Sequence, residues 1–436
     1  MKYLVVIFFL TCLTTLNAQE ELSLFFHPDV VQSGQLQPAY EGNSKFTIGF
    51  GSSYLHGDFR GPKLRDLTVS NEFLANLASS SIRNYLSADA SFNVFDVGFK
   101  KNDWWWRFGY NNNTHLYADF SPNFAKLFIN GNGDKVGETL DFGPDFYARQ
   151  YSELYVGASL PIYEFYRLGA NLKFISGSFD ISTPSSELSL TTGEEIYEIT
   201  LKNDYLVNTS YNSLEFSLRE LVPFSRPLQD NLGVSADFGF QFLSEQWDVS
   251  VSLLDVGLIN WKSNVINLQG EGEFTFDGFT FDELNLDTIS QLGDTLLSVF
   301  NVNVTNKSYN TTTPVKVIAG GEYHRNNTHF GAMLYGEWKQ NRFIPAVGVN
   351  IRQRIWKAWD LGISYAYKNN TYSNIGVSSV LNLGPFQAYA LTDNIIGPFL
   401  PSISRKVNVR LGVNLIFWKL NKPKQALPSS ETAALF

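Results

Sequence analysis

Apolar and polar residues alternate with a period of two along much of the chain. From Leu232 to Phe242 an apolar side chain occupies every second position, and Gly, Ser, Asp and Gln fill the positions between. The same alternation covers residues 407–417, and shorter examples lie at 46–50, 315–319, 330–338, 343–351 and 361–367. Successive side chains of a strand point to opposite faces, so the pattern predicts β-strands with one apolar and one polar face.

The length of these segments favours a membrane barrel over a soluble sheet. Strands of globular proteins run to about five or six residues, whereas a tilted strand needs about 9 to 11 to cross a bilayer. Small residues and isolated charges opposite Val, Leu and Phe are typical of a lumen behind a lipid-facing wall. A soluble sandwich would have shorter strands, and a propeller would repeat every ~40–50 residues, which this sequence does not. We therefore predict an all-β fold, a transmembrane antiparallel up-and-down β-barrel of about 14 strands (roughly 12 to 16) over residues 45–420.

The connections between the predicted strands fall into two classes. Short polar turns lie at "KND" (101–103), "SEQ" (244–246), "RNN" (325–327) and "KA" (357–358). The longest connection runs from about Lys262 to Thr313 and is rich in Asn, Asp and Thr. Outer-membrane barrels have short turns on one side and long loops on the other. We expect the long loop on the side away from the carboxyl terminus.

Two connections show helical spacing. In the first, Leu74, Leu77, Ile82 and Leu86 recur at helical intervals behind the candidate caps at residues 70–71. The second is "SPNFAKLFING", which begins at residue 121. The segment 74–86 is a candidate gate for the lumen, although helices in barrel loops more often pack on a loop.

The two ends of the chain differ in composition from the predicted barrel. Residues 1–18 combine Lys2, a short apolar run and the small residue Ala18, which predicts a signal peptide. Thr11 stands before Cys12 where a lipoprotein would have Gly or Ala, so the lipoprotein alternative is disfavoured. Residues 19–44 are expected to form a periplasmic or lumenal segment, and residues 421–436 a tail beyond the last strand.

Composition excludes several kinds of chemistry. The single cysteine lies in the predicted signal peptide, so the mature chain has no disulfide, thiolate site or cysteine nucleophile. The net charge of −9 includes Lys2, and removing that residue leaves −10, which argues against a nucleic-acid partner. No segment after the signal has the roughly 18 consecutive apolar residues of a membrane helix. The expected partner is the lipid bilayer of a Gram-negative outer membrane.

Motifs for catalysis or cofactor binding are absent from the sequence, so neither an enzyme nor a cofactor is expected. The two histidines closest in sequence, His324 and His329, flank a predicted turn and are expected to be turn or interface residues rather than metal ligands. The acidic part of the long loop offers oxygen ligands for calcium, but its spacing matches no calcium loop, and a solvated loop is the favoured interpretation. Its carboxylates are Glu271, Glu273, Asp277, Asp282, Glu283 and Asp287.

Two groups of residues follow from the barrel prediction. Isolated charges on the polar faces are candidates for the lumen, where they would select solutes or pair with one another. They are Lys173, Asp237, Glu322, Glu337, Arg352 and Arg410. Tryptophans at predicted strand ends are candidates for an aromatic girdle at the two bilayer interfaces, where indole is favoured. They are Trp104, Trp105, Trp106, Trp247, Trp261, Trp338, Trp356, Trp359 and Trp418.

Three stretches carry a resemblance to a known family. "LQPAYEGNSKFTIGF" (36–50) resembles the "NPA" opening of several outer-membrane barrel families of the Bacteroidota, with Gln37 where Asn is usual. "KLFINGNG" (126–133) and "LLDVGLINWKSN" (253–264) are similar to patterns of an uncharacterised Bacteroidota barrel family, a domain of unknown function. The group is distantly similar to fatty-acid-transporter-type barrels of 14 strands and to barrels associated with type IX secretion and gliding. The resemblance implies fold and location, and it brings no established activity.

Two functions therefore remain open. In the first, the barrel is a conduit or binding vessel for a hydrophobic or small solute, as the resemblance to the fatty-acid transporter type implies. In the second, it is a non-transporting partner or anchor of a secretion, adhesion or gliding assembly, with the long loop and the tail as contact surfaces for envelope proteins.

Overall fold

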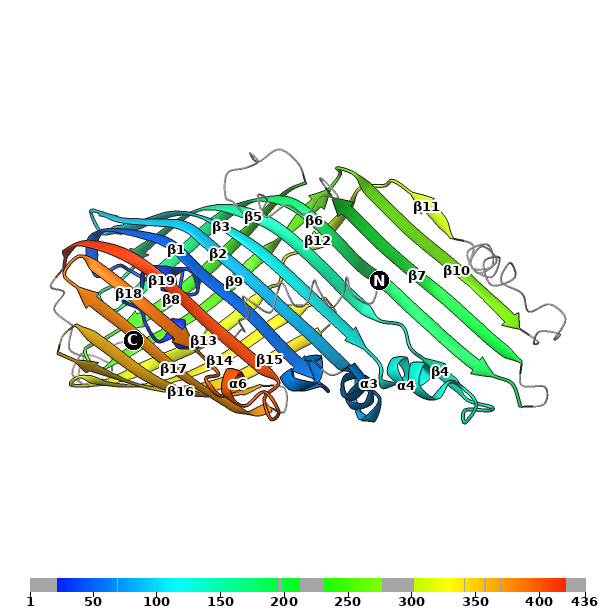
Figure 1. Ribbon diagram of the computed structural model, residues 1–436. Coiled ribbons are helices and arrows are strands. Elements are labelled where there is room, and N and C mark those ends of the chain that lie inside the picture. The colour runs from blue at the N-terminus through cyan, green and yellow to red at the C-terminus, as the bar shows by residue number, and fades with distance from the viewer. Residues whose placement is uncertain are drawn as a thin grey trace, which may run out of the picture.

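One sheet closes on itself to form the wall of the molecule. The computed structural model describes residues 22–68, 70–194, 198–211, 231–276, 302–340, 342–356, 358–368 and 371–420. In it β1 (Ser44–Arg60) pairs antiparallel with β2 (Asn84–Lys101) on one side and with the last strand, β19 (Lys406–Lys419), on the other. The result is a closed antiparallel barrel of 14 strands, which confirms the predicted fold (Figure 1). The predicted signal peptide and the tail 421–436 lie outside the described residues.

Neighbours in the wall are mostly neighbours in sequence, as in an up-and-down barrel. Between β2 and β19 the wall contains β3 (Trp104–Phe120), β5 (Asp145–Pro161), β6 (Tyr166–Thr192), β8 (Leu232–Leu243), β9 (Trp247–Trp261), β13 (Lys316–Arg325), β14 (Thr328–Lys339), β15 (Arg342–Ile355), β16 (Trp359–Lys368), β17 (Thr371–Leu383) and β18 (Phe386–Thr392).

The sheet extends beyond the closed wall at one place. β6 is 27 residues long; its first part pairs with β8, and its last part pairs with β7 (Ile199–Tyr211). β7 pairs in turn with β10 (Val265–Phe276), and this extension projects at the right of Figure 1. The prediction of one long loop over 262–313 was wrong in part, because β10, β11 (Asn303–Thr305) and β12 (Tyr309–Thr312) lie within it. Strand β4 (Thr139–Asp141) pairs with the end of β6.

The alternation of the sequence becomes an inside–outside alternation in the wall. On β8 Phe238 is 53% exposed and points outward, whereas its neighbour Asp237 is fully buried. The same contrast recurs around the barrel, with outward Val, Leu, Ile and Phe and inward Asn, Ser, Asp, Lys and Arg. An exposed apolar band of this kind around a polar interior suits insertion in a bilayer.

The two ends of the barrel differ in their connections. Chain segments 102–103, 162–165, 244–246, 326–327 and 384–385 make short turns at the end where β1 begins and β19 ends, which we call the turn end. Three of the four predicted turns are among them; the fourth includes Lys357, outside the described residues. The long connections 61–83, 121–144 and 393–405 lie at the opposite, loop end. Two connections at the loop end, 340–341 and 369–370, are also short, so the expected separation of short turns from long loops holds only in part.

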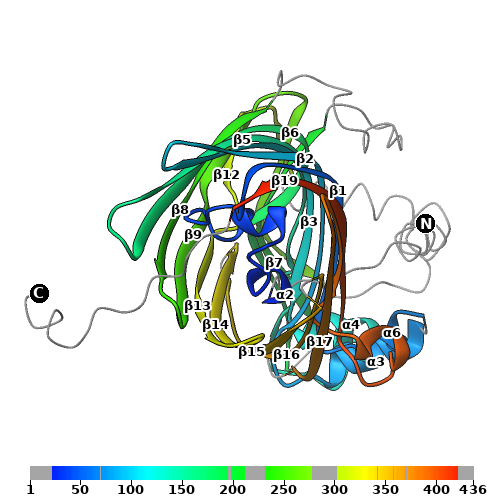
Figure 2. The same cartoon turned by 90° about the vertical axis from the view of Figure 1, so that its left-hand side faces the viewer.

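Short helices occupy the loop-end connections. They are η2 (Leu64–Thr68), α3 (Ser70–Ser79), α4 (Pro122–Asn130) and α6 (Ile396–Phe399). The predicted helix over 74–86 was too long, because Leu86 already belongs to β2. Leu77 of α3 packs on Phe120 and Ala125, and Figure 2 shows α3, α4 and α6 beside the ring of strands. The structure thus gives no support to a gate in this segment. No helix among the described residues has the length and hydropathy needed to cross a membrane.

The segment that precedes β1 lies inside the barrel. Residues 22–43 contain α2 (Leu22–Phe25) and the 3₁₀ helix η1 (Val31–Gln35), and most of these residues are buried. Figure 2, seen from the turn end, shows α2 within the ring of strands. We call residues 22–43 the plug.

Candidate functional site

The plug rests on an apolar patch of the inner wall. Leu22, Leu24, Phe25, Phe26, Val30 and Leu36 pack against Leu254, Ile318, Met333, Tyr335, Ala346, Ala366, Val380, Tyr389 and Leu391. Glycines of the wall make room for the larger plug side chains. A Cβ atom at Gly331 would lie 2.3 Å from the Phe26 ring, and one at Gly348 would lie 2.5 Å from the Leu22 side chain. The glycines of the polar strand faces therefore shape a seat for this segment.

Polar contacts to several wall strands hold the plug in register. His27 Nε2 lies 2.8 Å from Ser378 Oγ, and Gln32 Nε2 donates to Asn414 Oδ1 at 2.9 Å. The Tyr389 hydroxyl donates to Gln32 Oε1 at 3.0 Å. These groups are buried, and a buried polar group without a partner costs about 1–3 kcal/mol. The plug is therefore matched to the wall in hydrogen bonding as well as in shape.

Ion pairs attach the plug near the turn end. Asp29 lies 2.5 Å from Arg354 Nη2, which also lies 2.9 Å from Asp360. Burial acts to raise the pKa of Asp29, but the charges of Arg354 and Arg352 outweigh it and hold that pKa below its ordinary value. For His27, burial and the charge of Arg352 hold the pKa well below its ordinary value, so the imidazole is neutral at pH 7.

A second ion-pair group lies where the plug passes into β1. Glu41 accepts from Lys100 Nζ and from Arg167 Nη1, each at 2.7 Å. Lys100 belongs to β2 and Arg167 to β6, so one plug carboxylate ties together two separate parts of the wall.

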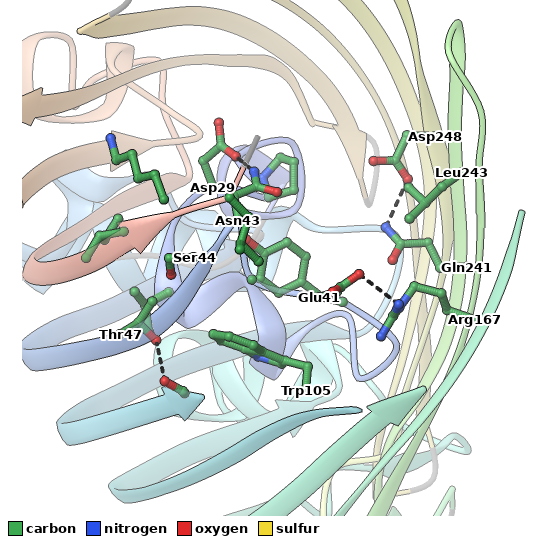
Figure 3. A pocket seen from close by; sticks show the side chains of 18 of the residues that line it. Asp29, Glu41, Asn43, Ser44, Thr47, Trp105, Arg167, Gln241, Leu243 and Asp248 are labelled. Atoms are coloured by element: carbon green, nitrogen blue, oxygen red, sulfur yellow. Dashed lines mark hydrogen bonds and ion pairs between the residues drawn. The ribbon is translucent and has the colours of Figure 1, made fainter. Parts of the chain in front are cut away.

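Between the plug and the wall a cavity of about 720 Å³ lies at the turn end. Figure 3 shows its side chains, with Asp29, Glu41 and Asn43 of the plug facing Trp105, Arg167 and Asp248 of the wall. Apolar surface comes from Val31, Tyr40, Trp105, Phe165, Leu243 and Ile416. Charged surface comes from Asp29, Glu41, Asp96, Arg107, Arg167, Asp248, Arg352 and Arg354. The cavity thus combines aromatic and aliphatic walls with several guanidinium and carboxylate groups.

Some buried polar atoms of residues that line this cavity lack partners. Within the described part of the chain, Arg107 Nε and Nη1, Trp105 Nε1 and Asp96 Oδ1 are buried and accept or donate no hydrogen bond. The third nitrogen, Arg107 Nη2, donates to Asn171 Oδ1 at 2.8 Å. A Cβ atom at Gly34 would lie 1.6 Å from Arg107 Nη1, so a larger residue there would displace this guanidinium. Arg107 and Trp105, adjacent inward positions of β3, are site residues that sequence reasoning missed.

All six residues predicted for the lumen lie on the inner face. Lys173 contacts Asp237 at 2.9 Å and Asp255 at 2.5 Å. Asp255 has φ of 58°, at a bulge where the register between β8 and β9 shifts, and this turns its carboxylate toward Lys173. The bulge was not visible in the alternation of the sequence. Beside this group lies a small polar cavity of about 60 Å³.

The remaining lumen candidates belong to other groups. Arg352 Nη2 contacts Glu322 Oε2 at 2.7 Å, close to the plug. The Arg410 guanidinium lies 4.3 Å from the centre of the Tyr54 ring. Glu337 lies 3.7 Å from Lys339 Nζ, at the loop end. The structure therefore divides the six charges among separate clusters along the barrel.

The loop end is closed by the wall's own side chains. Lys339 Nζ lies 2.6 Å from Asp89 Oδ2, and the other oxygen of Asp89 lies 2.6 Å from His115 Nδ1. His56 Nε2 approaches Asp89 at 3.4 Å. All four side chains are less than 10% exposed. We call this group the loop-end ionic layer.

The tryptophans divide between the outside and the inside of the barrel. Trp104, Trp247, Trp338, Trp356 and Trp418 are 40–84% exposed at strand ends, and Trp106 stacks on Trp104 with ring centres 5.5 Å apart. Trp359 is partly buried and donates to Ser379 Oγ. The girdle prediction was wrong for Trp105 and Trp261, which are 2% and 0% exposed. Trp105 points inward because its two neighbours point outward, and Trp261 Nε1 donates to Thr311 Oγ1 at 2.8 Å.

The acidic group of the predicted long loop is only partly described. Glu271 and Glu273 are exposed on β10, and Glu273 pairs with Lys202 at 2.9 Å. Residues 277–301, with the other four carboxylates, lie outside the described residues. The calcium alternative stays untested.

Comparison with known proteins gives a family and several similar folds. The protein-family model described as "Family of unknown function (DUF5723)" matches residues 38–393 of the sequence. No curated protein matches the sequence. Solved structures similar to the chain include the toluene transporter TbuX of Ralstonia pickettii, with 9% identity and a TM-score of 0.40 over 88% of this chain and 92% of that one. A FadL homologue of Pseudomonas aeruginosa has 9% identity and a TM-score of 0.40 over 89% and 91%. The translocator domain of the autotransporter NalP of Neisseria meningitidis has 8% identity and a TM-score of 0.34 over 87% and 91%. Similarities at this level carry no information about a substrate.

Proposed function

For a chain that belongs to the DUF5723 family of unknown function, we propose the role of a plugged outer-membrane barrel that binds a small amphiphilic solute in the turn-end cavity. The apolar outer band supports a place in the bilayer. Because β1 begins and β19 ends at the turn end, we place that end toward the periplasm and the loop end outward, as in barrels with short periplasmic turns.

The observation that carries this proposal is the presence of three unpartnered donor atoms, on Arg107 and Trp105, beside apolar surface. Buried donors in proteins are nearly always hydrogen-bonded, and an exception marks a place for an unseen partner. Arg107 Nε and Nη1 and Trp105 Nε1 are such donors in the described part of the chain. A guanidinium binds carboxylate and phosphate groups with two parallel hydrogen bonds. The solute we propose therefore has an anionic or strongly polar head for Arg107.

The rest of the cavity fits an apolar body. Tyr40 and Val31 of the plug and Leu243 of the wall lie on the lining next to these donors. The volume of about 720 Å³ is within the ~300–1,000 Å³ of small-molecule sites. The solute hypothesis includes a hydrophobic or a small solute. A purely hydrocarbon ligand would leave Arg107 Nε and Nη1 without partners, so an amphiphile fits this lining better.

The test is binding of a medium-chain carboxylate to the purified barrel in detergent micelles. The carboxylate is kept below its own critical micelle concentration. We expect saturable binding of decanoate by calorimetry, and a loss of about tenfold or more in affinity for Arg107→Gln, since a hydrogen bond to a charged group contributes about 1.5–3 kcal/mol. Decanol, which lacks the charge, should bind more weakly than decanoate.

The matched control is Arg342→Gln, which removes a guanidinium at the loop end, away from the cavity. Equal binding of decanoate by Arg107→Gln and the wild type would overturn the proposed site. A barrel that binds no amphiphile, while crosslinking in envelopes recovers one fixed protein, would instead favour the assembly partner hypothesis.

A further inference from the structure

Two histidines and a glutamate converge on the inner face of the β13–β14 hairpin. His324 and His329 are direct partners across the hairpin, and Glu322 lies two positions before His324 on the same face. The Nδ1 atoms of the two histidines contact one another, and their rings meet edge to face with centres 4.6 Å apart. One ligand atom from each of the three residues lies within 4.8 Å of the others.

The cluster is both accessible and oriented. His324 and His329 line the turn-end cavity, so an ion can reach them without unfolding of the wall. Arg352 holds the carboxylate of Glu322 through its Nη2 atom at 2.7 Å and through its Nε atom at 3.4 Å. Ligating carboxylates are usually hydrogen-bonded in this way by a second group, which fixes their direction. The hairpin thus presents three donors with one of them already positioned.

The local charge also favours a cation. Around the cluster three carboxylates, Glu322, Asp360 and Asp29, face two guanidiniums, Arg352 and Arg354. Three negative and two positive charges leave one negative charge, and the two histidines add neutral nitrogen donors. Two imidazoles and one carboxylate are the ligand set of open zinc sites, which keep a fourth position for water.

We propose that Glu322, His324 and His329 bind a divalent transition-metal ion, such as zinc, at the periplasmic mouth of the barrel. Both histidines bind through Nδ1. In the metal-free state the two Nδ1 atoms share one proton; on binding, that proton moves to Nε2 of the same ring, so both Nδ1 lone pairs face the metal. The fourth position opens on the cavity. The site does not depend on the proposed amphiphile.

A second histidine–carboxylate group in the same lumen shows what distinguishes a metal site. At the loop end Asp89 also lies between two histidines, His56 and His115. There the ammonium of Lys339 contacts Asp89 at 2.6 Å and occupies the place of a cation. At the turn end the cation that contacts Glu322 is the guanidinium of Arg352, at 2.7 Å, and the two imidazoles contact each other. The loop-end group therefore serves as a comparison in which both histidines contact the carboxylate of Asp89.

The test is titration of the full chain, stripped with chelator, with cobalt(II) and zinc(II) alone. We expect one cobalt ion to bind per chain and to give the visible-range absorption of tetrahedral cobalt. Zinc should displace this cobalt ion and abolish the absorption. His324→Ala and His329→Ala should each weaken binding by tenfold or more. Binding should weaken below about pH 6.5, since protons compete for the histidines.

Controls separate a lost ligand from a damaged fold. His115→Asn removes a histidine of the loop-end group, and Asn327→Ala alters the turn between β13 and β14; both should bind cobalt as the wild type does. Glu322→Gln, which keeps the side-chain size, guards against misfolding of the alanine variants and should also weaken binding. Absent cobalt absorption in the wild type, or equal binding by His324→Ala and His329→Ala, would overturn the site. Arg107→Gln, which should weaken decanoate binding, should bind cobalt as the wild type does, so the two proposals can fail separately.

Discussion

The plug and the loop-end ionic layer close the same lumen by different means. The plug is a separate segment whose apolar side chains fill a seat lined with glycine. Its hydrogen bonds and ion pairs to the wall are individual contacts with different strands. The ionic layer is made of wall side chains, and in it Lys339 and Asp89 are both almost fully buried. The first closure belongs to a segment outside the strands, whereas the second is made by side chains of the strands themselves.

This difference bears on transport. When a plug is removed, water replaces the polar contacts that it made with the wall. The net free-energy cost is therefore a sum of small contributions, one for each hydrogen bond or ion pair. Opening the ionic layer separates buried charges, whose loss of a partner costs several kcal/mol. Displacing the plug is therefore expected to cost less free energy than separating the loop-end ionic layer.

The largest expected effect comes from breaking the fixed closure. Lys339→Met leaves Asp89 and Glu337 buried without their ammonium partner, and we expect a loss of about 3–5 kcal/mol in the free energy of unfolding. Urea unfolding followed by heat-modifiable gel migration measures it. Lys202→Met, which breaks an exposed pair with Glu273, should cost at most about 1 kcal/mol. Similar losses for both variants would contradict a buried, structural layer.

Overpacking of the plug seat should have the next largest effect. Gly331→Leu places a side chain in the space of the Phe26 ring. Overpacking costs about 1–3 kcal/mol, and here it should destabilise the docked position of the plug by that amount. A cysteine at Ser33, which is fully buried, should then react with a maleimide about 10- to 100-fold faster. Gly133→Leu, at a glycine with open space around it, is the matched control. An unchanged labelling rate in Gly331→Leu would mean that the plug does not move as a unit.

A smaller effect should follow from loss of the plug's ion pair. Arg354→Gln removes the contact with Asp29, in which both side chains are about a quarter to a third exposed. A partly exposed pair contributes up to about 1 kcal/mol, so labelling at Ser33 should rise no more than about fivefold. High salt should have the same effect on the wild type and little on the variant. A tenfold or larger rise would show that this pair, rather than the seat, holds the plug.

The smallest effect near neutrality should come from pH. The pKa of His27 is held well below its ordinary value by burial and by Arg352, with Arg354 and His329 acting in the same sense and Asp29 against them. The docked plug therefore binds fewer protons than the free one, so docking weakens as pH falls below about 6.5.

The pKa of Asp29 is also lowered, and its contribution to docking is present above its ordinary pKa and is lost only in stronger acid, as pH falls through the lowered value. A spin label at Gln35→Cys should become more mobile on acidification. His27→Gln should abolish the part of this change between pH 6.5 and 5, while Asp29→Asn should leave that part in place. A wild-type spectrum that does not change over this range would contradict a neutral, buried His27.

The strands and their faces were predictable, because alternation is a local property of residues such as those from Leu232 to Phe242. A lumenal position was one of the two expected for residues 19–44, but the fit of the plug was not predictable, because it depends on wall glycines such as Gly331 and Gly348 that lie far from the plug in the sequence. The bulge at Asp255 was missed because one residue with positive φ leaves no trace in an apolar pattern. The convergence of Glu322, His324 and His329 depended on hairpin register, which a one-residue shift would have undone.

Three consecutive indoles near the turn end provide a built-in optical reporter. Trp104 and Trp106 stack together on the outer surface, while Trp105 packs on Gly42, where a Cβ atom would lie 2.4 Å from its ring. In a chain that keeps only Trp105, fluorescence senses the plug alone, and a water-soluble quencher reaches it when the plug departs. In a chain that keeps only Trp104 and Trp106, brominated lipid should quench the fluorescence instead. Tryptophan fluorescence from one strand can therefore distinguish a change in the lumen from a change in the surrounding membrane.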